Sequence, residues 1–328
     1  MLLGSSIKRC NYRKIKNIAI FLSSRNNYSL LEDFISRNEH HTNGYYFVNV
    51  DDFSDEDEIQ LGKSICEKYN IPFVPNKARG LQNATQTMIE HLESVGMSSR
   101  YIIWMTHDSH ILTNNFFPKF ESLVNSNKLD EFGIVGFNIL GPQCGVNNQK
   151  TITNDQCGML GRSPLTTLPG RGGWYRTPDM KLDWEVWGGN RAIAVESPVD
   201  MGLAINVELF KKHIKVTDNY HLFCAFDDIC IQFLNQGIYN VVIPFLQIWH
   251  DQYIKEGKVP IKSAQAAQLG DSKHFGDYGP HFVYWKNTWG WERDNVKNTF
   301  PLEKYTSGLI HDFYHHNYTT GPLKTFEL

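Results

Sequence analysis

The chain has 328 residues, of which 41% are hydrophobic and 20% are charged. This composition is typical of a globular protein with a large core and excludes a disordered or low-complexity chain. The net charge of −3 gives no electrostatic reason to expect nucleic acid or an anionic membrane as a partner. No stretch approaches the roughly 20 apolar residues that a membrane-spanning helix needs, so we expect a soluble cytoplasmic protein.

The first 140 residues alternate between short apolar runs and stretches of helical periodicity. The first apolar run follows a basic segment but is too short for a signal peptide, so it predicts a core strand. Strands are predicted at 17–23, 45–50, 71–74, 101–105 and 133–139, and helices at 30–37, 56–69, 80–95 and 112–124. This alternation predicts an α/β fold with a mostly parallel, doubly wound central sheet flanked by helices.

The second half of the chain is less regular. Residues 141–192 are rich in Gly, Pro and Asn, which is typical of a functional loop. Regular structure resumes at 198–210, 225–236 and 239–243, and a terminal helix is predicted near 303–315. We expect one main domain, residues 1–255, and a C-terminal extension, residues 256–328, that packs on it.

The six cysteines show no CxxC spacing. Cys66, Cys224 and Cys230 lie within apolar patterns and are predicted to be buried thiols. The spacing is compatible with a bridge between Cys144 and Cys157, but a reducing compartment is the simpler interpretation.

Acidic and histidine residues follow predicted strands or open a predicted helix at four places. These are Asp51-Asp52, Asp108-x-His110, Asp227-Asp228 and His250. Side chains alternate along an extended chain, so Asp108 and His110 are expected to point the same way. Because ligands of open α/β sheets bind at the carboxyl ends of strands, this carboxylate and imidazole can hold a divalent cation there.

Each of these residues also has a structural explanation, which the sequence leaves open. Asp51 and Asp52 can form a turn that caps the following helix. Asp227 and Asp228 can be first-turn acids that the helix dipole favours. A lone histidine such as His250 is most often a surface residue.

The order of these sites resembles the glycosyltransferases of the GT-A type, especially the large inverting family that builds polysaccharides (family 2). The segment VNVDDFSDED (48–57) resembles that family's aspartate-containing turn, and ARGLQNATQTMIEHL (78–92) resembles its helix start. The segment VDMGLAINVELFKK (199–212) is similar to the one under the acceptor site. The most specific match is FDDICIQFLNQGIYNVVIPFLQIWHD (226–251), which keeps an acidic pair, helix, Gly turn, strand and histidine in order. The resemblance covers roughly residues 17–251.

The metal motif departs from that family, which usually carries Asp-x-Asp. Asp108-Ser109-His110 resembles instead the Asp-x-His of the polypeptide N-acetylgalactosaminyltransferases, whose third metal ligand is a distant histidine. The resemblance therefore implies a Mn²⁺ or Mg²⁺ site formed by Asp108, His110 and His250, with the imidazoles favouring Mn²⁺. In an alternative register only Asp108 is a ligand.

The resemblance also implies the substrates and the roles of the site residues. The donor would be a nucleotide-diphosphate sugar, most often a UDP-sugar, and the acceptor a hydroxyl of a glycan, a lipid-linked sugar or a protein. In an inverting reaction Asp228 would be the general base and Asp227 would bind hydroxyls. The C-terminal extension could form a homo-oligomer contact. Lys77 and Arg79 could add positive charge near the donor phosphates, but a role as solvated surface residues fits them equally well. The implied donor-binding residues are Asp51, Asp52, Lys77, Arg79, Asn83 and Asp108.

Other functions remain open from the same residues. The Asp-x-His motif favours a retaining transferase on this scaffold. A catalytically silent sugar- or nucleotide-binding module would explain a weakened metal motif, although the intact Asp227 and Asp228 argue against it. A nucleotidyltransferase would not account for the 226–251 pattern, and a zinc hydrolase lacks an HExxH-type helix.

Overall fold

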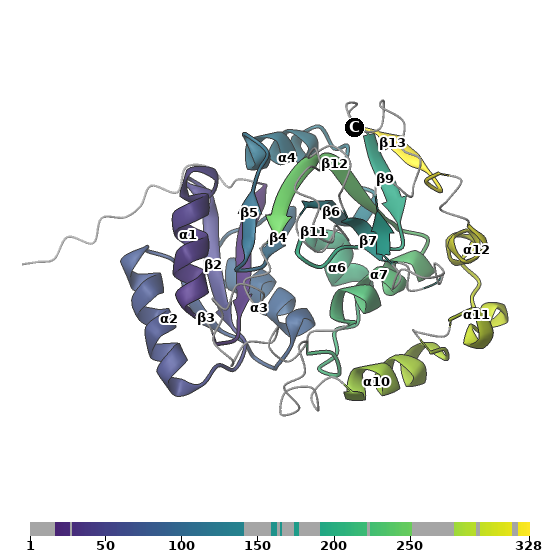
Figure 1. Ribbon diagram of the computed structural model, residues 1–328, viewed down its shortest axis with the longest axis horizontal. Coiled ribbons are helices and arrows are strands. Elements are labelled where there is room, and N and C mark those ends of the chain that lie inside the picture. Colours follow the sequence, from purple (N-terminus) through teal and green to yellow (C-terminus); the bar gives the residue numbers. More distant parts are fainter. Residues whose placement is uncertain are drawn as a thin grey trace, which may run out of the picture.

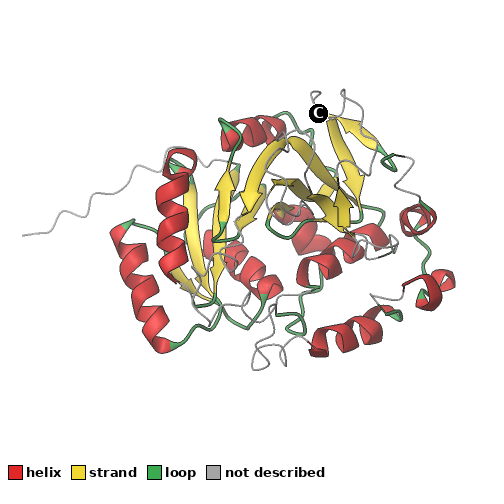
Figure 2. Ribbon diagram, viewed as in Figure 1, coloured by secondary structure: helices red, strands yellow, loops and turns green. Residues whose placement is uncertain are grey.

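A computed structural model describes residues 17–26, 28–140, 159–162, 165, 174–176, 191–221, 224–250, 279–292, 296–316 and 321–328. Its centre is one large sheet with helices on both sides (Figures 1 and 2). The strands are β1 (Ile18–Ser24), β2 (Tyr46–Asp51), β3 (Phe73–Pro75), β4 (Tyr101–Met105), β5 (Ser109–Ile111), β6 (Phe132–Leu140), β7 (Met159–Arg162), β8 (Trp174–Arg176), β9 (Arg191–Val195), β10 (Ser197–Pro198), β11 (Gly202–Asn206), β12 (Tyr239–His250) and β13 (Thr325–Glu327). The helices are α1 (Tyr28–Thr42), α2 (Glu56–Lys68), α3 (Leu81–Ser94), α4 (Phe116–Asn125), α6 (Val207–His213), α7 (Ala225–Asn235), α10 (Gly279–Trp289), α11 (Val296–Thr299) and α12 (Gly308–His315), with a short 3₁₀ helix at Leu302–Lys304.

The main path of the sheet runs β13-β9-β12-β6-β11-β4-β1-β2-β3. The strands β3, β2, β1 and β4 are parallel to one another, and β6 is parallel to β12. The strand β11 lies between β4 and β6 and is antiparallel to both, and β9 is antiparallel to β12 and β13. Only β11 and β9 therefore oppose the common direction on this path, which confirms the predicted mostly parallel sheet.

The two faces of the sheet bury two separate apolar clusters, as period-two alternation requires. In β1, Ala19 and Phe21 belong to one cluster, whereas Ile18, Ile20 and Leu22 belong to the other. The first cluster is covered by α3, α7 and the C-terminal helices, and the second by α1 and α4. Helices on both faces confirm the doubly wound arrangement.

Local pattern located the elements of the first half well, but several short strands were missed, among them β5 and β9. The predicted strand at 101–105 coincides with β4, and the predicted helices at 56–69 and 80–95 match α2 and α3 to within a residue at each end. The helix expected from residue 112 begins at Phe116 instead, because residues 109–111 form β5 against the end of β12. This pairing also extends the strand predicted at 239–243 as far as His250.

The described C-terminal segments pack on the same core as the sheet. The strand β13 pairs with β9, and α12 contributes Leu309, Ile310 and Phe313 to the cluster that contains α7. The division of the chain at residue 255 stays a prediction. Most of the irregular 141–192 segment, including Cys144 and Cys157, lies outside the described residues, whereas Cys66, Cys224 and Cys230 are buried free thiols as predicted. Within the described ranges, the helices are all too short or too polar to cross a bilayer.

Candidate active site

The carboxyl ends of β2, β4 and β12 lie at one edge of the sheet because these strands share a direction. Asp51 and Asp52 end β2, Asp108 lies in the turn after β4, and His250 ends β12. All four side chains are buried. The sheet therefore gathers polar groups where the ligands of such folds bind.

Asp108 and His250 are in direct contact. The distance from the His250 Nε2 to the Asp108 Oδ1 is 3.1 Å, and both side chains are at most 4% exposed. The backbone N–H of Ser109 donates to the Thr106 carbonyl at 3.1 Å, so Asp108 belongs to a turn rather than to a strand. That turn directs its carboxylate toward the end of β12.

His110 lies on the other side of β5. It pairs with Trp249, whereas His250 pairs with Ser109, and successive residues of a strand face opposite ways. The charge of His110 acts on the pKa of His41, a residue of α1. The expectation that Asp108 and His110 point the same way fails because the period-two rule does not hold across the turn.

The geometry fits a divalent cation with two protein ligands. Two ligands about 2.1 Å from one ion and at right angles to each other are about 3 Å apart, as the Asp108 oxygen and His250 nitrogen are. Throughout the part of the chain that the structure describes, no three His, Cys, Asp or Glu side chains are grouped to hold a metal. A ligand role for His110 therefore stays a prediction without geometric support.

His107 faces a different partner from its neighbour Asp108. Its Nε2 lies 2.7 Å from the Ser24 hydroxyl at the end of β1. Burial lowers the pKa of His107 to about 4, although Asp108 acts to raise it. The imidazole is thus neutral at physiological pH, and it joins the ends of β1 and β4.

Asp51 and Asp52 stabilise the two loops beside β2. Asp51 accepts a 2.5 Å hydrogen bond from the Tyr28 hydroxyl, and Asp52 Oδ1 accepts from the Gly80 N–H and the Asn76 amide, both at 2.8 Å. Burial raises the pKa of Asp52 to about 6, against the lowering effect of these two donors. Asp52 therefore fixes the loop that leads into α3.

The other expected donor-binding residues surround this loop. Lys77 forms an ion pair with Glu90 of α3, and its side chain is 70% exposed. Asn83 donates to the Arg79 carbonyl at 3.0 Å in the first turn of α3. Both the surface role and the phosphate-binding role remain open for Lys77 and Arg79.

Asp227 and Asp228 open α7 and are almost completely buried. Asp227 accepts a 2.7 Å hydrogen bond from the Ser197 hydroxyl. Asp228 accepts three, each at 2.8 Å, from Gln82, Gln232 and Trp289. Burial raises the pKa of Asp228, whereas these three neutral donors lower it.

Sequence reasoning missed the donors around these carboxylates. Gln82 lies 146 residues from Asp228 and Trp289 lies 61 residues away, and no local periodicity connects them. One signal was present for Gln82. The apolar spacing of α3 places Gln82 on its buried side, and a buried glutamine needs a polar partner.

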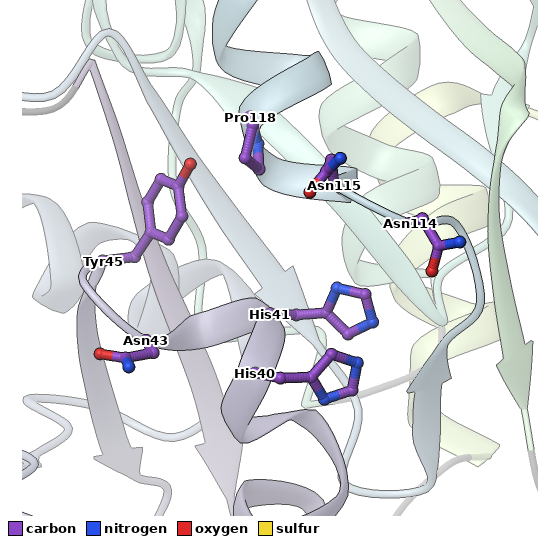
Figure 3. A pocket seen from close by; sticks show the side chains of 7 residues that line it. All are labelled: His40, His41, Asn43, Tyr45, Asn114, Asn115 and Pro118. Carbon is purple, nitrogen blue, oxygen red and sulfur yellow. The ribbon is translucent and has the colours of Figure 1, made fainter.

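A separate pocket opens away from these residues. It has a volume of about 460 Å³ and lies between the C-terminal end of α1 and the start of α4 (Figure 3). None of the predicted site residues lines it, so it is not part of the candidate active site. The lining residues are His40, His41, Asn43, Tyr45, Asn114, Asn115 and Pro118.

Solved structures resemble this fold at low sequence identity. GalNAc-T7 with UDP, GalNAc and Mn²⁺ matches with a TM-score of 0.51 at 14% identity, over 88% of this chain and 59% of that one. The mannosyltransferase PcManGT from Pyrobaculum calidifontis, in complex with GDP-Man and Mn²⁺, matches with a TM-score of 0.49 at 12% identity, over 84% of this chain and 66% of that one. This chain thus spans about three fifths of the length of GalNAc-T7.

No family model and no curated protein sequence matches the chain. The structural likeness confirms the predicted fold, because GalNAc-T7 is a GT-A type glycosyltransferase. The chain therefore has the GT-A fold, with its polar residues at the sheet edge where such folds bind ligands.

Proposed function

We propose that this protein is a metal-dependent glycosyltransferase that moves a sugar from a nucleotide-diphosphate donor, preferably a UDP-sugar, to an acceptor hydroxyl. The contact between Asp108 and His250, at the carboxyl edge of a GT-A sheet, is the observation that carries the proposal. GalNAc-T7, with which the chain shares its fold, was crystallised with UDP and Mn²⁺.

Asp108 and His250 would hold Mn²⁺ or Mg²⁺, which would supply positive charge beside the departing diphosphate. His110 could complete the set only if β5 rearranged. Asp51 and Asp52 would bind the nucleoside, and the loop that Asp52 fixes would bring Lys77, Arg79 and Asn83 toward the donor. The Glu90 carboxylate would have to release Lys77 before this lysine could neutralise a phosphate.

The reaction that fits the acidic pair is an inverting transfer. The acceptor O–H proton would pass to Asp228 as the acceptor oxygen bonds to the anomeric carbon. The bond from that carbon to the phosphate oxygen would break, and the nucleoside diphosphate would leave with the electron pair. Asp227 would bind hydroxyls of the acceptor or the donor. The acceptor class is a glycan, a lipid-linked sugar or a protein.

A panel of nucleotide sugars, with and without Mn²⁺, tests this proposal. Metal-dependent turnover of one donor is expected, with inversion at the anomeric carbon. The variant Asp228→Asn is expected to lower transfer by at least about 100-fold, within the usual contribution of a general base, while donor affinity changes less than about threefold. Loss of donor binding by this folded variant would assign Asp228 another role, and the absence of turnover from every donor would refute the proposal.

A further inference from the structure

The environment of Asp228 distinguishes its two oxygens. Oδ2 accepts from the side-chain amides of Gln82 and Gln232, whereas among the described residues Oδ1 accepts from the indole N–H of Trp289 alone. A carboxylate oxygen has about two acceptor positions. Oδ2 is therefore saturated, and Oδ1 keeps one position for a further donor.

The two glutamine amides are held in fixed orientations. Gln82 Oε1 accepts from the backbone N–H of Thr217 at 3.0 Å, and Gln232 Oε1 accepts from that of Lys215 at 2.7 Å. Each amide must then turn its NH₂ group toward Asp228. Their hydrogen bonds to Oδ2 thus follow from the backbone of the segment after α6 and leave Oδ1 as the reactive oxygen.

Trp289 reaches Asp228 from the C-terminal part of the chain. Its helix α10 is fixed by the fully buried Trp285, and the Trp289 carbonyl accepts a 2.6 Å hydrogen bond from the Tyr305 hydroxyl. The Trp289 ring packs against both Trp285 and Trp291, with centroid distances of 6.3 and 5.9 Å. The indole N–H is therefore held rigidly at the one oxygen that can still accept a hydrogen bond.

We propose that Trp289 is a positioning residue for the transfer reaction: its indole N–H directs Oδ1 of Asp228 at the acceptor hydroxyl and stabilises the negative charge of that oxygen. This inference rests on the proposed function and assigns a catalytic contribution to the segment after residue 255, which lies beyond the sequence resemblance at roughly residues 17–251. The acceptor bound at Oδ1 would lie beside the Trp289 ring, which suits a sugar because aromatic rings stack on sugar faces.

The electrostatic surroundings make this donor important. Asp228 interacts electrostatically with the ionisable side chains of Asp227, Tyr220 and Cys230, and none of these three groups is a cation. Hydrogen bonds from neutral groups are therefore what lowers the pKa of Asp228 against the raising effect of its burial. Removing one donor raises the pKa of Asp228, so the base is lost to protonation at a higher pH.

The test compares Trp289→Phe with the matched control Trp285→Phe. Trp285 is a buried tryptophan of the same helix, and within the described residues its indole nitrogen has no hydrogen-bond partner. For Trp289→Phe we expect the acidic limb of the kcat profile to move up by about one pH unit. At pH values well below the acidic limb this shift corresponds to about tenfold lower kcat, with the donor KM within about twofold of wild type. Trp285→Phe should leave the acidic limb where it is in the wild type.

Two further measurements keep the inference falsifiable. If Trp289→Phe does not fold, a 3-benzothienylalanine side chain at position 289 keeps the shape of tryptophan and deletes only the N–H. The ¹⁵N-labelled indole resonance of Trp289 should titrate with Asp228 in the wild type and should not do so in Asp228→Asn.

The outcomes separate the two proposals. An active enzyme whose acidic limb does not move from the wild-type position in Trp289→Phe would overturn the role of Trp289 and leave the transferase proposal intact. If the Trp289 indole resonance titrates with Asp228 but the protein turns over no donor, the transferase proposal is refuted and the contact between Trp289 and Asp228 stands.

Discussion

The carboxylate of Asp52 is predicted to reduce the stability of the protein at neutral pH. It is 5% exposed, and its Oδ1 accepts from Gly80 and Asn76. Burial raises its pKa from 3.8 to about 6, because the two donors compensate only part of the lost hydration. Asp52→Asn keeps an oxygen for both donors and removes the charge.

The sign and the size of the effect follow from proton linkage. The folded-state pKa of Asp52 lies above the unfolded value, so the folded protein holds the proton more tightly. The contribution of Asp52 to stability is fully present below about pH 3.8 and is lost as the pH rises through about 6. A difference of about two pK units corresponds to about 3 kcal/mol. Asp52→Asn should therefore be more stable than wild type at pH 7.5 by up to about 3 kcal/mol.

Urea unfolding between pH 4.5 and 7.5 measures this effect. The stability gain of Asp52→Asn should be largest at pH 7.5 and should shrink steadily toward pH 4.5. The control Asp52→Ala removes the acceptor and leaves buried donors unsatisfied, so it should be about 2–4 kcal/mol less stable than Asp52→Asn throughout that range. A gain that does not vary with pH, or no gain at all, would refute the argument.

Two further predictions concern the loop before α3 and the metal ligands. Gly80 has a φ of 112°, and a Cβ there would lie 2.6 Å from the Tyr220 carbonyl oxygen, so Gly80→Ala should cost at least about 2 kcal/mol in urea unfolding. Gly96→Ala, at a φ of 72° with open space around it, should cost less, and equal losses would show that the contact with Tyr220 is unimportant. His250→Ala should weaken Mn²⁺ binding by about tenfold or more in calorimetry, and an unchanged affinity would rule out His250 as a ligand.

The sequence predicted those parts of the fold that depend on local pattern. The run of apolar residues at 101–105 defines β4, and the acidic start of the helix at 56 matches α2 because acids favour the first turn. One of the missed strands, β5, has only three residues and forms because it pairs with the end of β12, more than 130 residues later. Such a strand has no local signal.

The same distinction applies to the site. The carboxylates and His250 could be found because they follow strands or open a helix, and the family resemblance placed Asp108 and His250 in one site. The separation of His110 from them depends on the register of β5 against β12, which the sequence does not reveal. The donors around Asp228 come from three helices, and only the folded chain brings them together.

The buried carboxylates at this edge indicate what the site uses. Asp52, Asp108, Asp227 and Asp228 are each at most 5% exposed. The fold alone does not require these charges, because an asparagine of the same shape could accept hydrogen bonds such as those from Gly80 or Ser197 without the cost of burying an ion. Groups kept at a cost in stability are typical of functional sites. A cation ligand such as Asp108 and a general base such as Asp228 would both need the negative charge itself, so the proposed transferase explains why carboxylates rather than amides stand at these two positions.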